Sequence, residues 1–217
     1  MNINNEVRKE IESFYLTHKR IIKERLKEFR EIGRRFLPLD IFTELAFCIL
    51  TPQSKAKECW EAILKMKEKK VLFEGTKEEI NKALRKVRFK NKKTEYLLEL
   101  REKFFKKNNS LYENIKKINS PLELREYLVR NVKGMGFKEA SHFLRNIGFG
   151  KEVAILDRHI LKNLKEFGVI KEYPKSLGEK KYKEIEGKMK KLAKRLEIPL
   201  DFLDLLLWAK ETGEVFK

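Results

Sequence analysis

The sequence predicts an all-α fold, and three observations carry that prediction. The chain has 217 residues but only 10 Gly and 5 Pro, so few positions interrupt regular structure. The apolar and polar alternation of strands is hard to find, whereas apolar residues at three- and four-residue steps recur along almost the whole chain. With 41% hydrophobic residues, the chain can bury one or two cores.

The helices can be placed in chain order from this spacing. Apolar side chains between Ile3 and Phe29 share one helical face, and Pro38 marks the end of that first unit. Residues 41–50 are apolar nearly all round, which predicts a helix buried in a bundle centre. Later helices are predicted at 54–69, 76–87, 91–107, 121–131, 137–147, 158–167, 178–195 and 200–211.

These helices are expected to form two subdomains, because a cleft between them would house a ligand in an all-helical chain. One discontinuous subdomain is predicted to join residues 1–40 and 137–217. The other is predicted to cover residues 41–136 and to lead into a hairpin between two helices.

Composition excludes several classes of protein. No apolar run approaches the ~20 residues that a membrane span needs, and the polar N-terminus lacks the apolar stretch of a signal peptide. Cys48 and Cys59 are too few for a disulfide framework or a four-cysteine metal or iron-sulfur site. We therefore expect a soluble, cytoplasmic protein without an iron-sulfur cluster.

The positive charge is concentrated in two segments. The chain has 51 Lys and Arg against 33 Asp and Glu, a net charge of +18. Residues 82–107 hold eleven basic and three acidic residues, and residues 175–195 hold nine and three. Nucleic acid is the natural partner of such surfaces, since each neutralised phosphate releases counterions. The alternative is a solvated Lys- and Glu-rich surface of the kind found in thermophile proteins.

The first basic segment also contains an aromatic residue, in RFKNKK at 88–93. Phe89 is a candidate wedge between bases, and Arg88 and Asn91 are candidates to reach an exposed base edge. The alternative interpretation makes Phe89 a core residue.

The segment V-K-G-M-G-F-K joins two predicted helices. Gly134 and Gly136 permit a tight turn and let backbone amides approach a partner without obstruction by a Cβ atom. The helix that begins near Phe137 presents unsatisfied N–H groups at the same place, and Lys133 flanks it. These features predict a hairpin that binds the DNA backbone.

Lys138 and Asp157 are the candidate catalytic pair. The helix at 137–148 rises about 18 Å, and residues 149–156 can extend up to ~26 Å, so the chain can return to its starting level. A positioned amine can act as a nucleophile, and a carboxylate beside it suits glycosidic cleavage, where positive charge develops on a sugar. The alternatives are that Lys138 only touches phosphate and that Asp157 only caps the next helix.

These residues resemble the helix-hairpin-helix, Gly/Pro-Asp superfamily of DNA base-excision glycosylases. The resemblance lies in the G-M-G hairpin, Lys138 two positions later, and Asp157 in the segment LDRHI. Lys133 departs from the pattern, because many members carry Pro before the first Gly, where it adds rigidity rather than chemistry. The segment LTPQSKA at 50–56 is similar to the family's L-S-x-Q loop, which implies that Gln53 contacts DNA near the extruded base.

The absence of cysteine after Cys59 disfavours the iron-sulfur members, such as endonuclease III. The lysine implies a bifunctional glycosylase and AP lyase. The short chain, RFKNKK and the ending LLLWAKETGEVFK resemble the archaeal-type 8-oxoguanine DNA glycosylase/lyase class, the second Ogg class. That resemblance implies that the α-carboxylate of Lys217 accepts the Watson-Crick donors of oxidised guanine and that Trp208 is the stacking platform. The alternatives are a chance terminal lysine and a core tryptophan.

The resemblance also implies a monovalent cation, Na+ or K+, held by the backbone carbonyls of Arg130, Val132 and Met135, with no cofactor required. The predicted function is removal of 8-oxoguanine from duplex DNA, followed by β-elimination through a lysine Schiff base. The predicted protein is a nucleoid-associated monomer. The alternatives are a glycosylase for another damaged base and a non-catalytic DNA-binding hairpin module.

Overall fold

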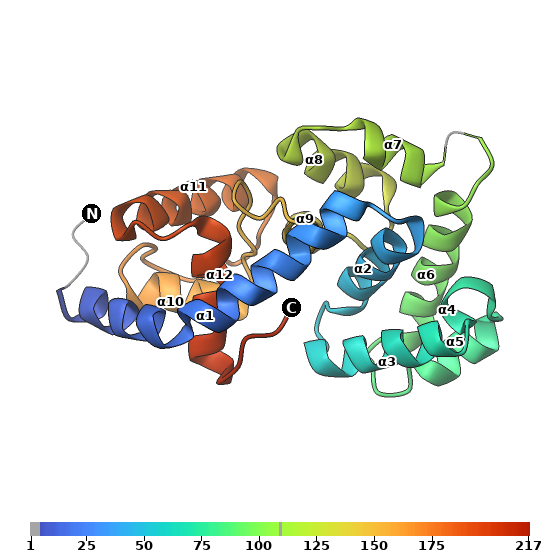
Figure 1. Cartoon of the computed structure of the whole chain (residues 1–217), viewed down its shortest axis with the longest axis horizontal. Helices are drawn as coiled ribbons and strands as arrows, with labels where there is room; N and C mark the ends of the chain where they lie inside the picture. Colours follow the sequence, from blue (N-terminus) through green and yellow to red (C-terminus); the bar gives the residue numbers. More distant parts are fainter. Residues whose placement is uncertain (1–4, 109) are drawn as a thin grey trace. The chain divides into compact units, whose positions relative to one another are not determined.

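A computed structural model describes residues 5–108 and 110–217, so Ile3 lies outside the described residues. Within that range the regular structure consists of twelve helices and contains no strand (Figure 1). The all-α prediction is therefore confirmed. None of the described helices combines the length and the apolar character needed to cross a lipid bilayer.

The chain divides into two units. One joins Met1–Arg34 with Leu144–Lys217, and the other covers Arg35–Phe143. We call these the terminal unit and the central unit. Their boundaries fall after residues 34 and 143, whereas the sequence analysis placed them after residues 40 and 136. Helix α9 (Phe137–Asn146) begins in the central unit and ends in the terminal unit.

The terminal unit contains α1 (Asn5–Arg35), α10 (Arg158–Glu166), α11 (Glu179–Leu196) and α12 (Leu200–Thr212). Helix α12 packs against α10 and α11, and residues 200–207 are all buried. The apolar face of α1 is buried at Ile22 and Phe29. Near the end of α1, a Cβ atom on Gly33 would lie 1.9 Å from the carbonyl oxygen of Ile147. Only glycine therefore permits this close approach of the two backbones.

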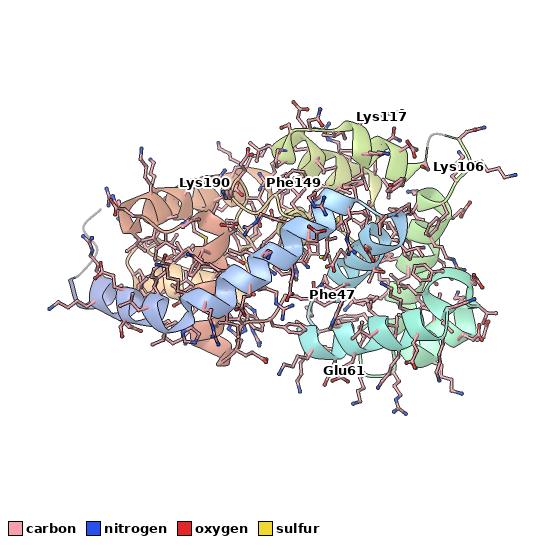
Figure 2. All side chains as sticks on the ribbon, in the orientation of Figure 1. Phe47, Glu61, Lys106, Lys117, Phe149 and Lys190 are labelled. Carbon is pink, nitrogen blue, oxygen red and sulfur yellow. The ribbon has the colours of Figure 1, made fainter. Side chains whose placement is uncertain are left out.

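The central unit contains the remaining helices in an arrangement centred on α2 (Pro38–Leu50). Helix α2 packs against α3 (Ala56–Glu68) and α6 (Lys90–Phe104), and residues 41–50 are buried, which confirms the predicted central helix. Its Phe47 lies between Trp60 at 5.2 Å and His142 at 5.4 Å, measured between ring centroids. In Figure 2, Phe47 lies within this packing while Glu61 on α3 points outward. The other helices are α4 (Val71–Glu74), α5 (Lys77–Ala83), α7 (Leu111–Lys117) and α8 (Pro121–Asn131).

The differences from the predicted helices concern short elements. The helix predicted at 76–87 ends at Ala83, and the residues that follow form turns leading to Phe89. Helices α4 and α7, with four and seven residues, were not predicted. Segments of this length contain too few turns to establish an apolar periodicity. The Ser110 side chain caps α7, whereas α4 has no side-chain cap.

Candidate active site and DNA-contacting segments

Lys138 lies in the first turn of α9 and its side chain is 24% exposed. Its Nζ lies 2.8 Å from Oε1 of Glu139 and donates a 3.4 Å hydrogen bond to Oγ1 of Thr51. The amine is therefore held between a carboxylate and a hydroxyl while part of it stays accessible. Neither Glu139 nor Thr51 was predicted from the sequence. The three-residue spacing from Gly136 to Glu139, typical of a capping box, was the available signal for the carboxylate.

The hairpin that precedes Lys138 is tied to the same carboxylate. The Gly136 N–H donates to Oε2 of Glu139 at 3.1 Å. Gly134 has a φ of +82°, and a Cβ there would lie 2.4 Å from the ring of Tyr96 on α6. The turn therefore requires glycine both for its backbone angle and for its contact with Tyr96.

The other hairpin residues of interest are Lys133 and the predicted cation donors. The Nζ of Lys133, on a 61% exposed side chain, lies 3.2 Å from a carboxylate oxygen of Glu99. Such an exposed pair contributes little to stability. Among the three predicted cation donors, the Val132 carbonyl accepts the Met135 N–H at 3.2 Å, and Arg130 lies near the end of α8.

Gln53 and Phe89 share an unusual backbone conformation. Both lie in the left-handed region, with φ values of 53° and 58°, and both are exposed. Phe89 is 55% exposed, with the Arg88 guanidinium 5.4 Å from its ring centroid, so it is not a core residue. Left-handed backbone at bulky residues is strained and clusters at functional sites. The nearby Asn91 is also exposed and accepts a 2.8 Å hydrogen bond from Asn81.

The structure corrects the predicted basic surfaces. Lys93, counted among the basic residues of RFKNKK, is only 4% exposed and points into the central unit. It therefore cannot contribute to a DNA-facing surface. On α11, Lys181, Lys183 and Lys188 pair with glutamates three or four positions away on the same helix. These pairs match the alternative of a solvated Lys- and Glu-rich surface for this segment.

Asp157 is the N-cap of α10 in the terminal unit, which confirms the predicted cap. Its Oδ1 accepts hydrogen bonds from the N–H groups of His159 and Ile160, both at 2.9 Å. Oδ1 thus accepts both capping hydrogen bonds, and Oδ2 of the half-buried carboxylate takes no part in the cap. The sequence of the α10 start therefore orients this carboxylate rigidly.

Trp208 and Lys217 belong to the same unit as Asp157. The half-buried Trp208 ring lies 6.4 Å from the His159 ring and 6.2 Å from the Phe216 ring, measured between ring centroids, and its plane is inclined by 29° to that of Phe216. The Nζ of Lys217 lies 5.8 Å from the ring centroid of Phe29 on α1. The C-terminal segment therefore folds back onto the unit rather than extending away from it.

Arg145 and Asp204 form a buried ion pair in the terminal unit that the sequence analysis did not identify. The Arg145 Nη1 donates to Oδ2 of Asp204 at 2.8 Å, and the two side chains are 4% and 5% exposed. Burial raises the pKa of Asp204 to about 7, Arg145 opposes that rise, and the Asp157 carboxylate adds to it. Asp204 lies one helical turn before Trp208.

The predicted site residues thus fall into two groups. Asp157 stands with Trp208 and Lys217 in the terminal unit, and Lys138 stands with the remaining residues in the central unit. The central group comprises Gln53, Arg88, Phe89, Asn91, Lys133, Gly134 and Gly136.

Comparison with known proteins extends over almost the whole chain. A family model described as "8-oxoguanine DNA glycosylase" matches residues 22–198. The 8-oxoguanine DNA glycosylase/AP lyase of Fusobacterium nucleatum is 50% identical over 214 residues, which cover 98% of this chain and 99% of that protein.

Solved structures are similar over the same extent. The crystal structure of the Thermotoga maritima 8-oxoguanine DNA glycosylase matches with a TM-score of 0.87 and 35% identity, covering 98% of this chain and 99% of that one. The Methanocaldococcus jannaschii 8-oxoguanine glycosylase/lyase, crystallised with a 15mer DNA containing 8-oxoguanine, matches with a TM-score of 0.88 and 34% identity. This match covers 98% of this chain and 100% of that one. The chain therefore belongs to the 8-oxoguanine DNA glycosylase family.

Proposed function

We propose that this protein removes 8-oxoguanine from duplex DNA and then cleaves the strand at the resulting abasic site. The observation that carries the proposal is the match, across 98% of the chain, to a relative crystallised with DNA that contains 8-oxoguanine. The proposal is also supported by a partly exposed Lys138 and a capped Asp157, the two residues that carry the resemblance to the family motif.

In the proposed chemistry, the unprotonated amine of Lys138 attacks C1′ of the damaged nucleotide. The glycosidic bond breaks and its electron pair leaves with the base. The sugar ring then opens, with O4′ taking a proton, to give a protonated Schiff base on Lys138. Loss of the C2′ proton drives departure of the 3′ phosphate, which cleaves the strand by β-elimination. Glu139, 2.8 Å from the amine, is positioned to accept or hold its proton.

We propose that Asp157 stabilises the positive charge that develops on the sugar during this attack. Its cap bonds use only Oδ1 and orient the carboxylate, and among the described residues no cation is paired with it. This role requires Lys138 and Asp157 to act on the same nucleotide in the DNA complex.

The damaged nucleotide must leave the base stack, at a cost of a few kcal/mol. We propose that the exposed Phe89 fills the gap, that Gln53, Arg88 and Asn91 contact the surrounding DNA, and that the hairpin with Lys133 grips the backbone. Stacking of the extruded base on Trp208, with about 1 to 3 kcal/mol per base on aromatic platforms, would offset much of that cost. Lys217 would read the base edge through its α-carboxylate.

A hairpin cation is a further proposal on which no step of the reaction depends. The Val132 carbonyl already accepts one N–H, but a carbonyl oxygen has a second lone pair for a cation. We propose that the backbone carbonyl oxygens of Arg130, Val132 and Met135 bind this monovalent cation. Because the proposed substrate is duplex DNA, we also propose that the protein is associated with the nucleoid. We further propose that it is a monomer, and size-exclusion chromatography with light scattering measures its oligomeric state.

A lesion panel tests the proposed function. Labelled duplexes would carry 8-oxoguanine opposite cytosine, a thymine glycol, a preformed abasic site or no lesion. We expect nicking at 8-oxoguanine and at the abasic site without added alkali. Absence of cleavage at 8-oxoguanine, or faster cleavage at thymine glycol, would contradict the assignment.

A further inference from the structure

Lys93 on α6 directs its ammonium group into the central unit, where three oxygen atoms surround it. The Nζ donates to the carbonyl oxygens of Leu50 and Pro52, both at 2.8 Å, and to Oγ of Ser54 at 2.9 Å. The side chain is only 4% exposed. An ammonium group has three protons, so this set of acceptors satisfies it completely, as burial of a charge requires.

The segment that the ammonium holds carries two residues of the proposed active site. The acceptors at Leu50 and Pro52 lie on either side of Thr51, whose hydroxyl accepts from Lys138 at 3.4 Å. Gln53 follows directly, in its left-handed conformation. Because both ends of this short segment are bonded to one group, Lys93 limits the positions that the segment can take.

Ser54 connects the same ammonium to a second segment. Its Oγ also accepts the N–H of Arg88 at 3.1 Å, directly before Phe89. The Lys93 N–H in turn donates to the Phe89 carbonyl at 3.0 Å. Gln53 and Phe89, which both have left-handed backbone conformations, are thus tied to one ammonium-hydroxyl pair.

We propose that Lys93 is a positioning residue that, through Ser54, holds Gln53 and Phe89 in the geometry needed to enter the duplex when the damaged base leaves the stack. The inference rests on the proposed function, because it assigns Lys93 to the base-extrusion step of that reaction. Direct contact between the Lys93 charge and DNA is excluded by its burial. Burial is also the largest of the influences that lower the pKa of Lys93, because the charged ammonium group is better solvated in water than inside the protein.

A positioning role differs measurably from a general structural role. Excision of 8-oxoguanine needs the base to be extruded, whereas a preformed abasic site has no base to extrude. Loss of Lys93 should therefore reduce excision much more than abasic-site nicking, which is affected only through the 3.4 Å contact between Thr51 and Lys138. A general loss of structure would reduce both rates by the same factor.

The test compares Lys93→Met with Lys65→Met in single-turnover reactions on both duplexes. Lys65 is an exposed lysine of α3 in the same unit, so the control removes one positive charge without touching the 50–54 segment. We expect Lys93→Met to lose about ten- to a hundredfold in excision, as small misplacements of active groups do, and about threefold or less in abasic-site nicking. Excision equal to that of Lys65→Met, or equal loss on both duplexes, would overturn the proposal.

Ser54→Ala provides a second variant that keeps the lysine. It should show the same selective loss of excision, to a smaller extent, and the double variant should be no worse than Lys93→Met. Losses of excision rate that add in the double variant, or unchanged excision by Ser54→Ala, would contradict a positioning effect that Lys93 exerts through Ser54.

A readout without substrate separates this inference from the proposed function. Amide hydrogen exchange at the non-proline residues of 51–54 and at residues 88–89 should be faster in Lys93→Met than in Lys65→Met. Unchanged exchange there would reject the positioning role. If the unmodified protein does not cleave 8-oxoguanine duplexes, the proposed function fails whatever the exchange shows.

Discussion

Arg145 and Asp204 form an ion pair enclosed within the unit that also contains Asp157 and Trp208. The donor and acceptor atoms lie 2.8 Å apart, and both side chains are almost completely buried. Since burial raises the pKa of Asp204 to about 7, the folded protein holds this proton over a pH range in which the unfolded chain releases it.

This relationship predicts how stability depends on pH. Between about pH 4 and pH 7 the folded state binds the Asp204 proton and the unfolded state does not, so the stability contribution present at low pH is lost as pH rises. The Asp204→Asn variant has no titratable carboxyl group at this position. The free energy of unfolding of the unmodified protein, relative to the variant, should therefore fall by about 1.4 kcal/mol per pH unit in this window.

Urea denaturation of both proteins at pH 5, 6, 7 and 8 measures this difference. The variant also alters the hydrogen bond from Arg145, but the part of that change that does not depend on protonation offsets the difference by a constant and leaves its slope unchanged. A difference that stays constant from pH 5 to pH 7 would show that Asp204 is ionised throughout.

Phe89→Ala should separate function from stability. Because the side chain is 55% exposed, its loss should change the free energy of unfolding by only about 0.5 kcal/mol. Excision of 8-oxoguanine should fall by about tenfold or more, since the wedge supports base extrusion. Tyr173→Ala is the matched control, because Tyr173 is a 50% exposed aromatic residue outside the proposed site. Equal excision by the two variants would remove the wedge assignment.

Gly134→Ala should destabilise the hairpin. The added methyl group meets the Tyr96 ring, and the φ of +82° disfavours any side chain, so we expect about 1 to 3 kcal/mol of destabilisation and weaker DNA binding. Gly187→Ala on α11 is the control, because nothing lies within 4 Å of a Cβ there. That substitution in a helix interior should stabilise the protein by about 0.5 to 1 kcal/mol. Thermal unfolding checks both values, and opposite signs are the expected result.

Deletion of Lys217 should reduce discrimination between oxidised and normal guanine. The residue is the proposed reader of the base edge, and its loss moves the α-carboxylate to Phe216, away from its proposed contacts, which are worth about tenfold in selectivity. Excision rates on duplexes with 8-oxoguanine and guanine opposite cytosine measure the ratio. Unchanged discrimination would reject this role and leave the proposed chemistry of Lys138 untouched.

The sequence predicted what depends on local patterns and missed what depends on distant contacts. The cap at Asp157 was predictable, because a carboxylate before an amphipathic stretch has few other local roles. Lys93 was misassigned, since a lysine in a basic run is normally solvated and its three acceptors come from a segment some forty positions away. The pairing of Arg145 with Asp204 could not be predicted from local patterns, because the two residues are separated by 59 positions.

Borohydride trapping tests the central claim, that the amine of Lys138 forms the Schiff base. Reduction converts the enzyme-DNA imine into a stable covalent adduct that gel electrophoresis detects. The unmodified protein and the control Lys65→Gln should form this adduct with 8-oxoguanine duplex, and Lys138→Gln should form none. An adduct of undiminished yield with Lys138→Gln, or no adduct with the unmodified protein, would contradict the account.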